Sequence, residues 1–340
     1  MERPARTRNP RRSEAEVKAI LLAGGTGTRL RPLTGLMNKH MLPVYQYPMI
    51  HYAIHTLAEA GADEILLVTG RQSAGLFIDY LGSGEAFGAR LTYLIQEQAG
   101  GIAQALDLAK PFIAPQEKFL MLLGDNLVED SLKPYVEAYR GQEPGTAMVL
   151  LKEVPDPHRY GVPVFDSEGG IAAIEEKPAN PATSYSVTGI YLYDGSVFDI
   201  VAVTQPSGRG ELEITDVNNA YARQGKLRYE VLPGWWTDAG TFDSLHEAAG
   251  WMKDRMAAAG AGRAAGGADG AGGSAGTDEA GAAAESGEAA EPGEADEAGA
   301  GKSVPVEAVP PDDAPTPAAT EESAAAMDAS PADDDSASQG

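Results

Sequence analysis

ILLAGGTGTRLRPLTGLMNKHMLPVYQYP, residues 20–48, is the stretch around which this chain is organised. It continues the apolar run 17–23, which is too short to span a membrane and therefore predicts a buried strand of a parallel sheet. Gly24, Gly25 and Gly27 come next, and their lack of Cβ atoms allows backbone N–H groups to approach an anion. A glycine-rich loop at the carboxyl end of a strand indicates a phosphate site.

Three cations follow within the same stretch: Arg29, Arg31 and Lys39. Fixed positive charge beside bare amides is what a triphosphate requires. Spacing excludes two common phosphate loops. A dinucleotide fingerprint needs glycine where Leu30 stands, and a P-loop needs a Gly-Lys pair followed by Ser or Thr, which this loop lacks. Taken alone, the glycines fit equally well a surface turn with solvated arginines.

Strands and helices alternate in the first part of the chain. Strands are predicted over 64–69, 91–96 and 118–123, and helices over 48–60, 74–81 and 102–109. The first of these helices begins at Pro48 and ends at Gly61, as helices commonly do. This alternation predicts a parallel sheet with right-handed crossovers.

The second half has another character. Strands are predicted over 146–152, 185–193 and 228–232, a β-hairpin over 162–165 and 171–176, and helices over 216–224 and 242–256, the last capped by Thr241. The two halves together predict an α/β fold, a Rossmann-like open mixed sheet flanked by helices. The β-hairpin portion belongs to the second half.

Composition divides the chain into three parts. Residues 257–340 contain eighteen acidic residues against Arg263 and Lys302, a net −16 of the chain's −24, so residues 1–256 carry −8. Without aromatic residues or periodicity, 257–340 is predicted to be a disordered acidic tail, or alternatively a segment that recruits a partner. Residues 1–16, with five arginines, are predicted to be a disordered basic extension. A single folded domain over 17–256 is large enough to bury a substantial core.

Several classes of protein are excluded. The chain has no cysteine, which excludes disulfides and a cysteine nucleophile and is compatible with a reducing cytoplasm, where we expect the protein. The sequence has no apolar stretch of about eighteen residues and no secretory signal. The basic extension lacks aromatic residues and a recognition helix. Neither a membrane nor a nucleic acid is an expected partner.

A series of ordered motifs resembles the sugar-phosphate nucleotidyltransferases, and among them most the glucose-1-phosphate thymidylyltransferases. The motifs are GGTGTRLRPLT at 24–34, LGDN at 123–126, RYG at 159–161, EEKP at 175–178, RGELEITD at 209–216 and WTDAGT at 236–241. The resemblance implies that a sugar 1-phosphate, glucose 1-phosphate above all, attacks the α-phosphate of dTTP and releases pyrophosphate. Small-molecule substrates are therefore the expected partners.

Two carboxylates are candidates for a metal site. Asp125 comes directly after a buried strand, and Asp238 lies in a predicted turn before the last helix. At a separation of about 4 Å their repulsion would amount to about 4 kcal/mol at an effective dielectric constant of 20, which a divalent cation would remove. Each could instead cap a turn or a helix. The resemblance implies that both bind Mg²⁺, the expected cofactor.

The resemblance implies roles for further residues. Arg29 and Lys39 would hold the triphosphate, and Lys177 and Arg209 the phosphate of the sugar, with Arg29, Lys39 and Lys177 counted as catalytic. The remaining implied contacts are Gly24, Gly25, Gln96 and Gly101 with the nucleotide, and Gly161, Glu176 and Trp236 with the sugar. Gln96 has both donors and an acceptor for a pyrimidine edge. Without the resemblance, Lys177 could equally belong to a solvated run of charged residues. Gln96 could equally be an exposed residue at the end of a strand.

Two positions depart from the family pattern. His40 stands where glutamine is usual and Tyr47 where lysine is usual. A UTP-using sugar-1-phosphate uridylyltransferase therefore stays open as an alternative. A non-catalytic regulatory paralogue that binds nucleotide sugars is another alternative, although none of the implied charged residues has been lost. The sequence also leaves open whether the chain forms a homo-oligomer.

Overall fold

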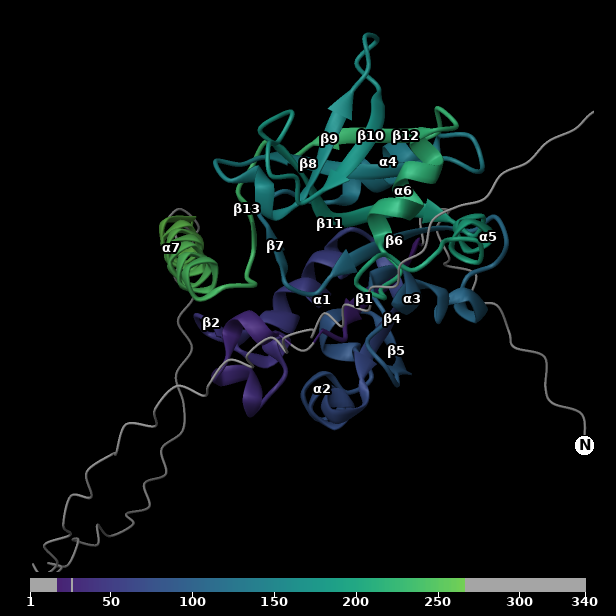
Figure 1. Cartoon of the computed structure of the whole chain (residues 1–340). Helices are drawn as coiled ribbons and strands as arrows, with labels where there is room; N and C mark the ends of the chain where they lie inside the picture. The colour runs from purple at the N-terminus through teal and green to yellow at the C-terminus, as the bar shows by residue number, and fades with distance from the viewer. Residues whose placement is uncertain (1–16, 26, 267–340) are drawn as a thin grey trace, which may run out of the picture. The chain divides into compact units, whose positions relative to one another are not determined.

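The computed structural model describes residues 17–25 and 27–266 (Figure 1). The extension predicted for residues 1–16, and the part of the predicted tail after residue 266, lie outside the described residues. Among the described helices, none combines the length and the apolar character needed to cross a membrane.

A nine-stranded mixed sheet forms the centre of the fold. Its strands are β1 (Val17–Ala23), β4 (Ala62–Gly70), β5 (Arg90–Gln96), β6 (Lys118–Leu123), β8 (Ala147–Glu153), β9 (Gly161–Phe165), β10 (Ile171–Glu176), β11 (Tyr185–Asp194) and β12 (Leu227–Val231). The main order is β10-β9-β11-β6-β1-β4-β5, and β8 joins β12 to β11. β1 is parallel to β4 and β6, whereas β11 is antiparallel to β6. The predicted open mixed sheet is confirmed.

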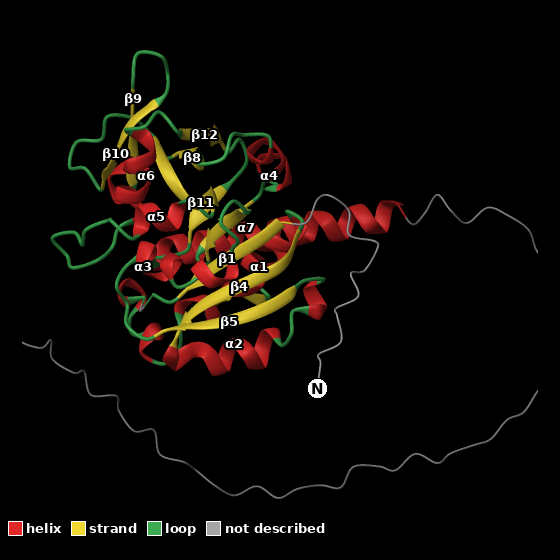
Figure 2. Ribbon diagram, turned by 90° about the vertical axis from the view of Figure 1, so that its right-hand side faces the viewer, coloured by secondary structure: helices red, strands yellow, loops and turns green. Residues whose placement is uncertain are grey.

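The two halves of the sheet differ in their strand directions. β6, β1, β4 and β5 are parallel neighbours, and three of them, β1, β4 and β5, lie side by side in Figure 2. β9 and β10 form an antiparallel hairpin, which stands at the top of Figure 1. Antiparallel β11 is the strand that connects these two halves.

Helices cover both faces of the sheet. They are α1 (Met49–Glu59), α2 (Ala74–Leu81), α3 (Ile102–Asp107), α4 (Lys133–Arg140), α5 (Val197–Val201) and α6 (Ile214–Ala222). A further helix, α7 (Phe242–Gly266), packs in a separate cluster with Val44, Leu127 and Ala239. Alternation along β1 determines which helices its side chains meet. Ala19 and Leu21 belong to the core under α1, α2 and α4, whereas Ile20 and Leu22 belong to the core under α3, α5 and α6.

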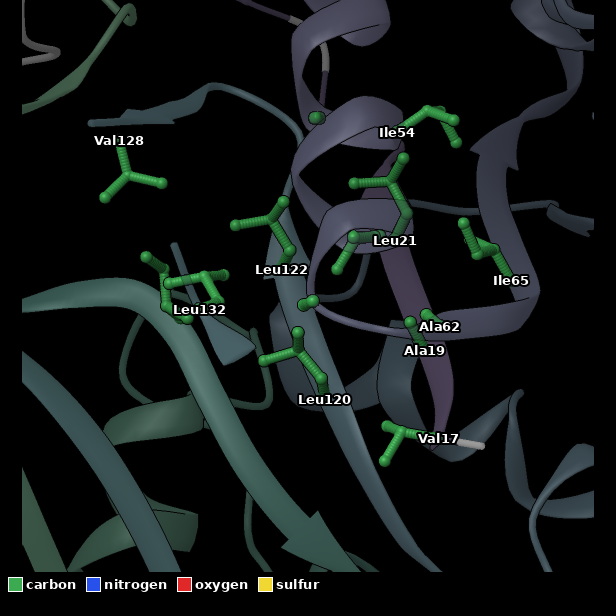
Figure 3. Close-up of a cluster of buried hydrophobic side chains, with 14 of the residues drawn as sticks. Val17, Ala19, Leu21, Ile54, Ala62, Ile65, Leu120, Leu122, Val128 and Leu132 are labelled. Carbon is green, nitrogen blue, oxygen red and sulfur yellow. The ribbon is translucent and has the colours of Figure 1, made fainter. Parts of the chain in front are cut away.

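The core under α1 is built from the two central strands. Leu21 of β1 lies beside Ile54 of α1, and Leu122 and Leu120 continue the same cluster along β6, as Figure 3 shows. All four side chains are completely buried. Because β1 and β6 end at the glycine loop and at Asp125, this packing also fixes the position of both segments.

Several elements differ from the sequence-based prediction. α7 continues past Met256 to Gly266, so the first residues assigned to the tail are helical, in keeping with their high alanine content. The predicted cap is confirmed, because the N–H of Ser244 donates to Thr241 Oγ1 at 3.2 Å. α4 and α5 were not predicted: α4 has eight residues with few apolar ones among them, and α5, although apolar, has only five residues. Residues 236–238 form a strand instead of a turn.

Replacement of Leu122 by alanine is expected to destabilise the fold, because it leaves a cavity between β6 and α1. The expected loss in the free energy of unfolding is about 2–5 kcal/mol. Leu36→Ala is the matched control, since the Leu36 side chain is 89% exposed, and should change stability little. Urea unfolding measures both variants, and equal stability of the two would contradict the packing described here.

Candidate functional site

A cavity of about 410 Å³ opens at the carboxyl ends of β1, β5 and β6. The glycine loop follows β1, Gln96 ends β5 and Asp125 follows β6. The opposite wall comes from β9, β10 and the loop before α6. All the site residues singled out in the sequence line this cavity: Gly24, Gly25, Arg29, Lys39, Gln96, Gly101, Asp125, Gly161, Glu176, Lys177, Arg209, Trp236 and Asp238.

The loop after β1 is held by side chains that follow it in the chain. Thr34 Oγ1 donates to the Gly27 carbonyl at 2.7 Å, and Asn38 Nδ2 donates to the carbonyl that ends β1 at 3.1 Å. Gly27 has φ of +63°, and a Cβ there would lie 2.9 Å from Thr34. Asn38 also caps the 3-10 turn Lys39–Met41 by accepting a hydrogen bond from the His40 N–H. These bonds present Lys39 to the cavity.

Asp125 and Asp238 are brought together by a two-stranded antiparallel ribbon, β7 (Asn126–Val128) and β13 (Trp236–Asp238). Asp125 immediately precedes β7, and Asp238 pairs with Asn126 across the ribbon. The N–H of Ala239 donates to the Asp125 carbonyl at 2.8 Å. Only 8% and 9% of the two aspartates are exposed. The strand at 236–238, which sequence analysis missed, is thus the element that aligns the carboxylates.

The two carboxylates have different surroundings. Lys39 Nζ lies 2.5 Å from Asp125 Oδ2. Burial raises the pKa of Asp125, but the charge of Lys39 and hydrogen bonds from Lys39 and Asn126 outweigh it and hold that pKa well below its usual range. Burial also raises the pKa of Asp238, and there the hydrogen bond from Tyr160 offsets only part of the effect.

Cations also surround Asp238. Arg29 Nη2 lies 3.9 Å from Oδ2, and Arg159 Nη2 lies 3.5 Å from Oδ1. Tyr160 donates to Oδ1 at 2.7 Å and packs edge-on against Trp236, with 5.5 Å between ring centroids. Arg159 and Tyr160 were noted only as parts of a motif in the sequence, where nothing indicated which side chain would meet the carboxylate.

Asn126 of β7 links three segments of the cavity lining: Asp125, β11 and β13. Its Oδ1 accepts hydrogen bonds from Trp236 Nε1 at 2.9 Å and from the Gly189 N–H at 2.8 Å. Both partners can only donate, so the Nδ2 group must face Asp125 Oδ1, 3.0 Å away. Asn126 thereby positions Trp236 and Asp125 at once. Sequence analysis gave Asn126 no role, because its hydrogen bonds join strands that are distant in the sequence.

His40, one of the two departures from the family pattern, lines the cavity. Burial first, and then the charge of Lys39, lower the pKa of His40 to about 3, so the ring is neutral. Its Nδ1 lies 2.7 Å from Asn38 Oδ1, an acceptor, so the proton resides on Nδ1. Tyr47, the other departure, is exposed, stacks on His51 at 4.1 Å between ring centroids and is absent from the described lining.

Glu176 lies at the centre of the opposite wall. Thr215 Oγ1 donates to Glu176 Oε2 at 2.7 Å, while Lys177 Nζ and Arg209 Nη2 approach Oε1 at 3.3 and 3.7 Å. The side chains of Lys177 and Arg209 are about half exposed, which leaves both cations accessible from the cavity. Thr215 was not singled out, since α6 begins at Ile214, earlier than predicted.

Lys177 has an unusual backbone conformation, with φ of +47°. Such a conformation is costly for a residue with a side chain, and it is held here by a hydrogen bond from the Lys177 N–H to the Tyr160 carbonyl at 2.9 Å. The turn directs the chain out of β10 beside the cavity. Lys177 is therefore held in a defined backbone position, unlike a residue of a solvated charge run.

Comparisons with known proteins agree with this geometry. The profile of the nucleotidyl transferase family matches residues 18–255. A glucose-1-phosphate thymidylyltransferase of Actinoplanes sp. is 42% identical over 240 residues, which cover 70% of this chain and 78% of that protein.

Solved structures match over the same region. A Bacillus anthracis protein in complex with sucrose is 48% identical, with a TM-score of 0.67, over 70% of this chain and 96% of its own. A UDP-glucose pyrophosphorylase bound to UDP-glucose is 26% identical, with a TM-score of 0.64, over 70% of this chain and 99% of its own. The resemblance inferred from the sequence motifs is confirmed, and the chain belongs to the nucleotidyl transferase family of enzymes.

Proposed function

We propose that this protein transfers a nucleotidyl group from dTTP to glucose 1-phosphate, forming dTDP-glucose and pyrophosphate. The observation that carries the proposal is one cavity lined by two groups of cations, Arg29 with Lys39 and Lys177 with Arg209, and by a pair of buried aspartates. The name of the Actinoplanes relative supports a sugar 1-phosphate as the acceptor.

In the proposed reaction, a phosphate oxygen of the sugar 1-phosphate attacks the α-phosphorus of the triphosphate. A new P–O bond forms, the bond from the α-phosphorus to the bridging oxygen of the β-phosphate breaks, and pyrophosphate leaves with that oxygen. Such a displacement depends on positioning and neutralisation of charge and needs no covalent intermediate with the protein.

The two groups of cations would bind different substrates. Arg29 and Lys39, beside the glycine loop, would hold the triphosphate, and Lys177 and Arg209 would hold the phosphate of the sugar. Glu176, fixed by Thr215, would accept hydrogen bonds from sugar hydroxyls. Trp236, fixed by Asn126, would lie against the sugar ring. Both substrates would be immobilised by side chains that are themselves hydrogen-bonded to neighbours.

The two aspartates fit a magnesium ion. Carboxylate oxygens are hard ligands, and Mg²⁺ is commonly held by one or two carboxylates together with phosphate oxygens and water. Among residues 17–25 and 27–266, no group of three His, Cys, Asp or Glu side chains is placed to hold a metal. When bound, the ion would neutralise charge on the phosphates. Lys39 would then exchange its contact with Asp125 for one with the triphosphate.

UTP is the second candidate for the nucleotide. The matching UDP-glucose pyrophosphorylase structure favours it, and His40 is a departure that lies inside the cavity. Thymine and uracil differ only in the methyl group at C5, and a single methyl group contributes limited discrimination in a pocket. A direct comparison of nucleotides is therefore required.

Release of pyrophosphate is the first test. With Mg²⁺ and glucose 1-phosphate, we expect turnover with dTTP, compared side by side with UTP, CTP, ATP and GTP in a coupled pyrophosphate assay. Faster turnover with UTP would support the proposed reaction but identify UTP as the nucleotide substrate. Binding of nucleotide without turnover on any sugar phosphate would contradict the proposal and favour the non-catalytic paralogue.

Asp125→Asn is expected to lower kcat/KM by about a hundredfold or more, because a ligand charge for the metal is lost. Treatment with EDTA should likewise abolish turnover of the unaltered protein, and added Mg²⁺ should restore it. Asp79→Asn, an exposed aspartate on α2, is the control and should behave like the unaltered protein. Normal rates of Asp125→Asn at ordinary Mg²⁺ concentrations would refute the metal assignment.

Lys177→Ala should raise the KM for glucose 1-phosphate by about tenfold or more, as loss of a charge-assisted contact with its phosphate predicts. The KM for the triphosphate should change little. Lys110→Ala removes an exposed lysine outside the cavity and serves as the control. Steady-state kinetics with each substrate varied in turn measure both values, and equal increases would mean that the two phosphate sites are wrongly divided.

A further inference from the structure

The amide group of Gln96, at the end of β5, is held by a second glutamine. Gln96 Nε2 donates to Gln104 Oε1 at 2.8 Å. The same oxygen accepts a hydrogen bond from the Gly100 N–H at 2.9 Å. Gln104 belongs to α3 and is absent from the cavity lining, whereas Gln96 lines the cavity and is 8% exposed.

These contacts determine which way both amides face. A backbone N–H can only donate, so the Gln104 atom beside Gly100 must be the carbonyl oxygen. The Gln96 atom that meets this oxygen must therefore be the Nε2 group. One backbone N–H thus fixes the orientations of two side-chain amides that could otherwise be reversed.

The opposite end of the Gln96 amide is directed to the glycine loop. A Cβ at position 24 would lie 2.6 Å from Gln96 Oε1, so Gly24 is the residue that admits this oxygen. Within the part of the chain that the structure describes, no group donates a hydrogen bond to Oε1. An acceptor is thus available to a ligand beside Gly24, and Nε2 retains a second hydrogen for the same ligand.

The loop around Gly101 is equally constrained. Leu212 N–H donates to the Gly100 carbonyl at 2.8 Å, and Ala103 N–H donates to the Leu212 carbonyl at 3.1 Å. Gly101 has φ of +100°, and a Cβ there would lie 2.4 Å from the Leu212 carbonyl oxygen. The backbone at Gly101 and the Gln96 amide therefore form two fixed points on one wall of the cavity.

We infer that Gln104 is a positioning residue that sets base selectivity by fixing the orientation of the Gln96 amide. The inference rests on the proposed function, since it concerns the nucleotide of that same site. An acceptor flanked by a donor matches a ring N–H beside a carbonyl, as in thymine and uracil. Cytosine bound in the same position would place its ring nitrogen acceptor against Gln96 Oε1 and its amino donor against Gln96 Nε2. Both contacts would then be repulsive. Gln104 thus favours thymine and uracil over cytosine without touching the base.

Gln104→Met tests the inference because methionine is of similar length but accepts no such hydrogen bond. The Gln96 amide would then be free to rotate by about 180°. We expect the ratio of the affinity for UTP to that for CTP to fall about tenfold, which corresponds to the energy of one mispaired hydrogen bond. Gln104→Glu retains the acceptor and should restore the ratio. Gln98→Met alters an exposed glutamine of the same loop and should leave the ratio unchanged.

The measurement is calorimetric binding of dTTP, UTP and CTP, without sugar phosphate, alongside kcat/KM for each nucleotide. Equal loss of affinity for all three in Gln104→Met, with the ratio preserved, would overturn the inference and leave Gln104 a purely structural residue. In a Gln96→Met background, Gln104→Met should cause no further change in the ratio, and an independent effect there would also overturn the inference.

Binding and turnover separate this inference from the proposed function. A protein that binds dTTP and UTP in preference to CTP, loses that preference in Gln104→Met and releases no pyrophosphate would support the role of Gln104 and contradict the enzymatic proposal. A protein that turns over but discriminates poorly against CTP would support the reaction and overturn the inference.

Discussion

The hydrogen bond between the Ala239 N–H and the Asp125 carbonyl closes the β7–β13 ribbon, and the site depends on this closure. Asp125 belongs to the part of the chain that supplies the glycine loop, whereas Asp238 follows the strands of the second half. Two acidic side chains repel one another, so their proximity must be imposed by the backbone. The ribbon does this with hydrogen bonds that do not depend on the charge of either side chain. Lys39, Arg29 and Tyr160 then compensate the carboxylates.

Donor-only groups give the polar side chains of the cavity their orientation. The Gly189 N–H and Trp236 Nε1 decide which end of the Asn126 amide meets Asp125. The Gly100 N–H decides the same for Gln104 and, through it, for Gln96. An amide side chain can present either a donor or an acceptor, and rotation exchanges the two at little cost in shape. A fixed backbone N–H removes that ambiguity before any substrate binds, which is what a preorganised polar site requires.

Local sequence patterns predicted most of the fold, because β1, β4 and β6 are short apolar runs followed by glycine or polar turns. Contacts between distant segments were harder to predict. Residues 236–238 contain too few residues for a strand signal, and only pairing with β7 makes them one. The resemblance indicated the charged residues that contact ligands in the family. It did not indicate Asn126, Thr215 or Gln104, which act on other side chains, since a motif does not show which partner a buried amide or hydroxyl will find.

His40 and Tyr47, the two departures from the family pattern, lie in different surroundings. Tyr47 is exposed and stacks on His51, so replacement of a lysine there alters surface charge outside the described lining of the cavity. His40 is buried against the loop beside Lys39 and Asp125, and its ring is neutral. A neutral side chain with Nδ1–H bonded to Asn38 adds no charge to the cavity beside the glycine loop, as glutamine would add none. The substitution at position 40 therefore leaves the net charge of the site unchanged, and any effect on ligand choice must arise from the shape or the hydrogen bonds of the ring.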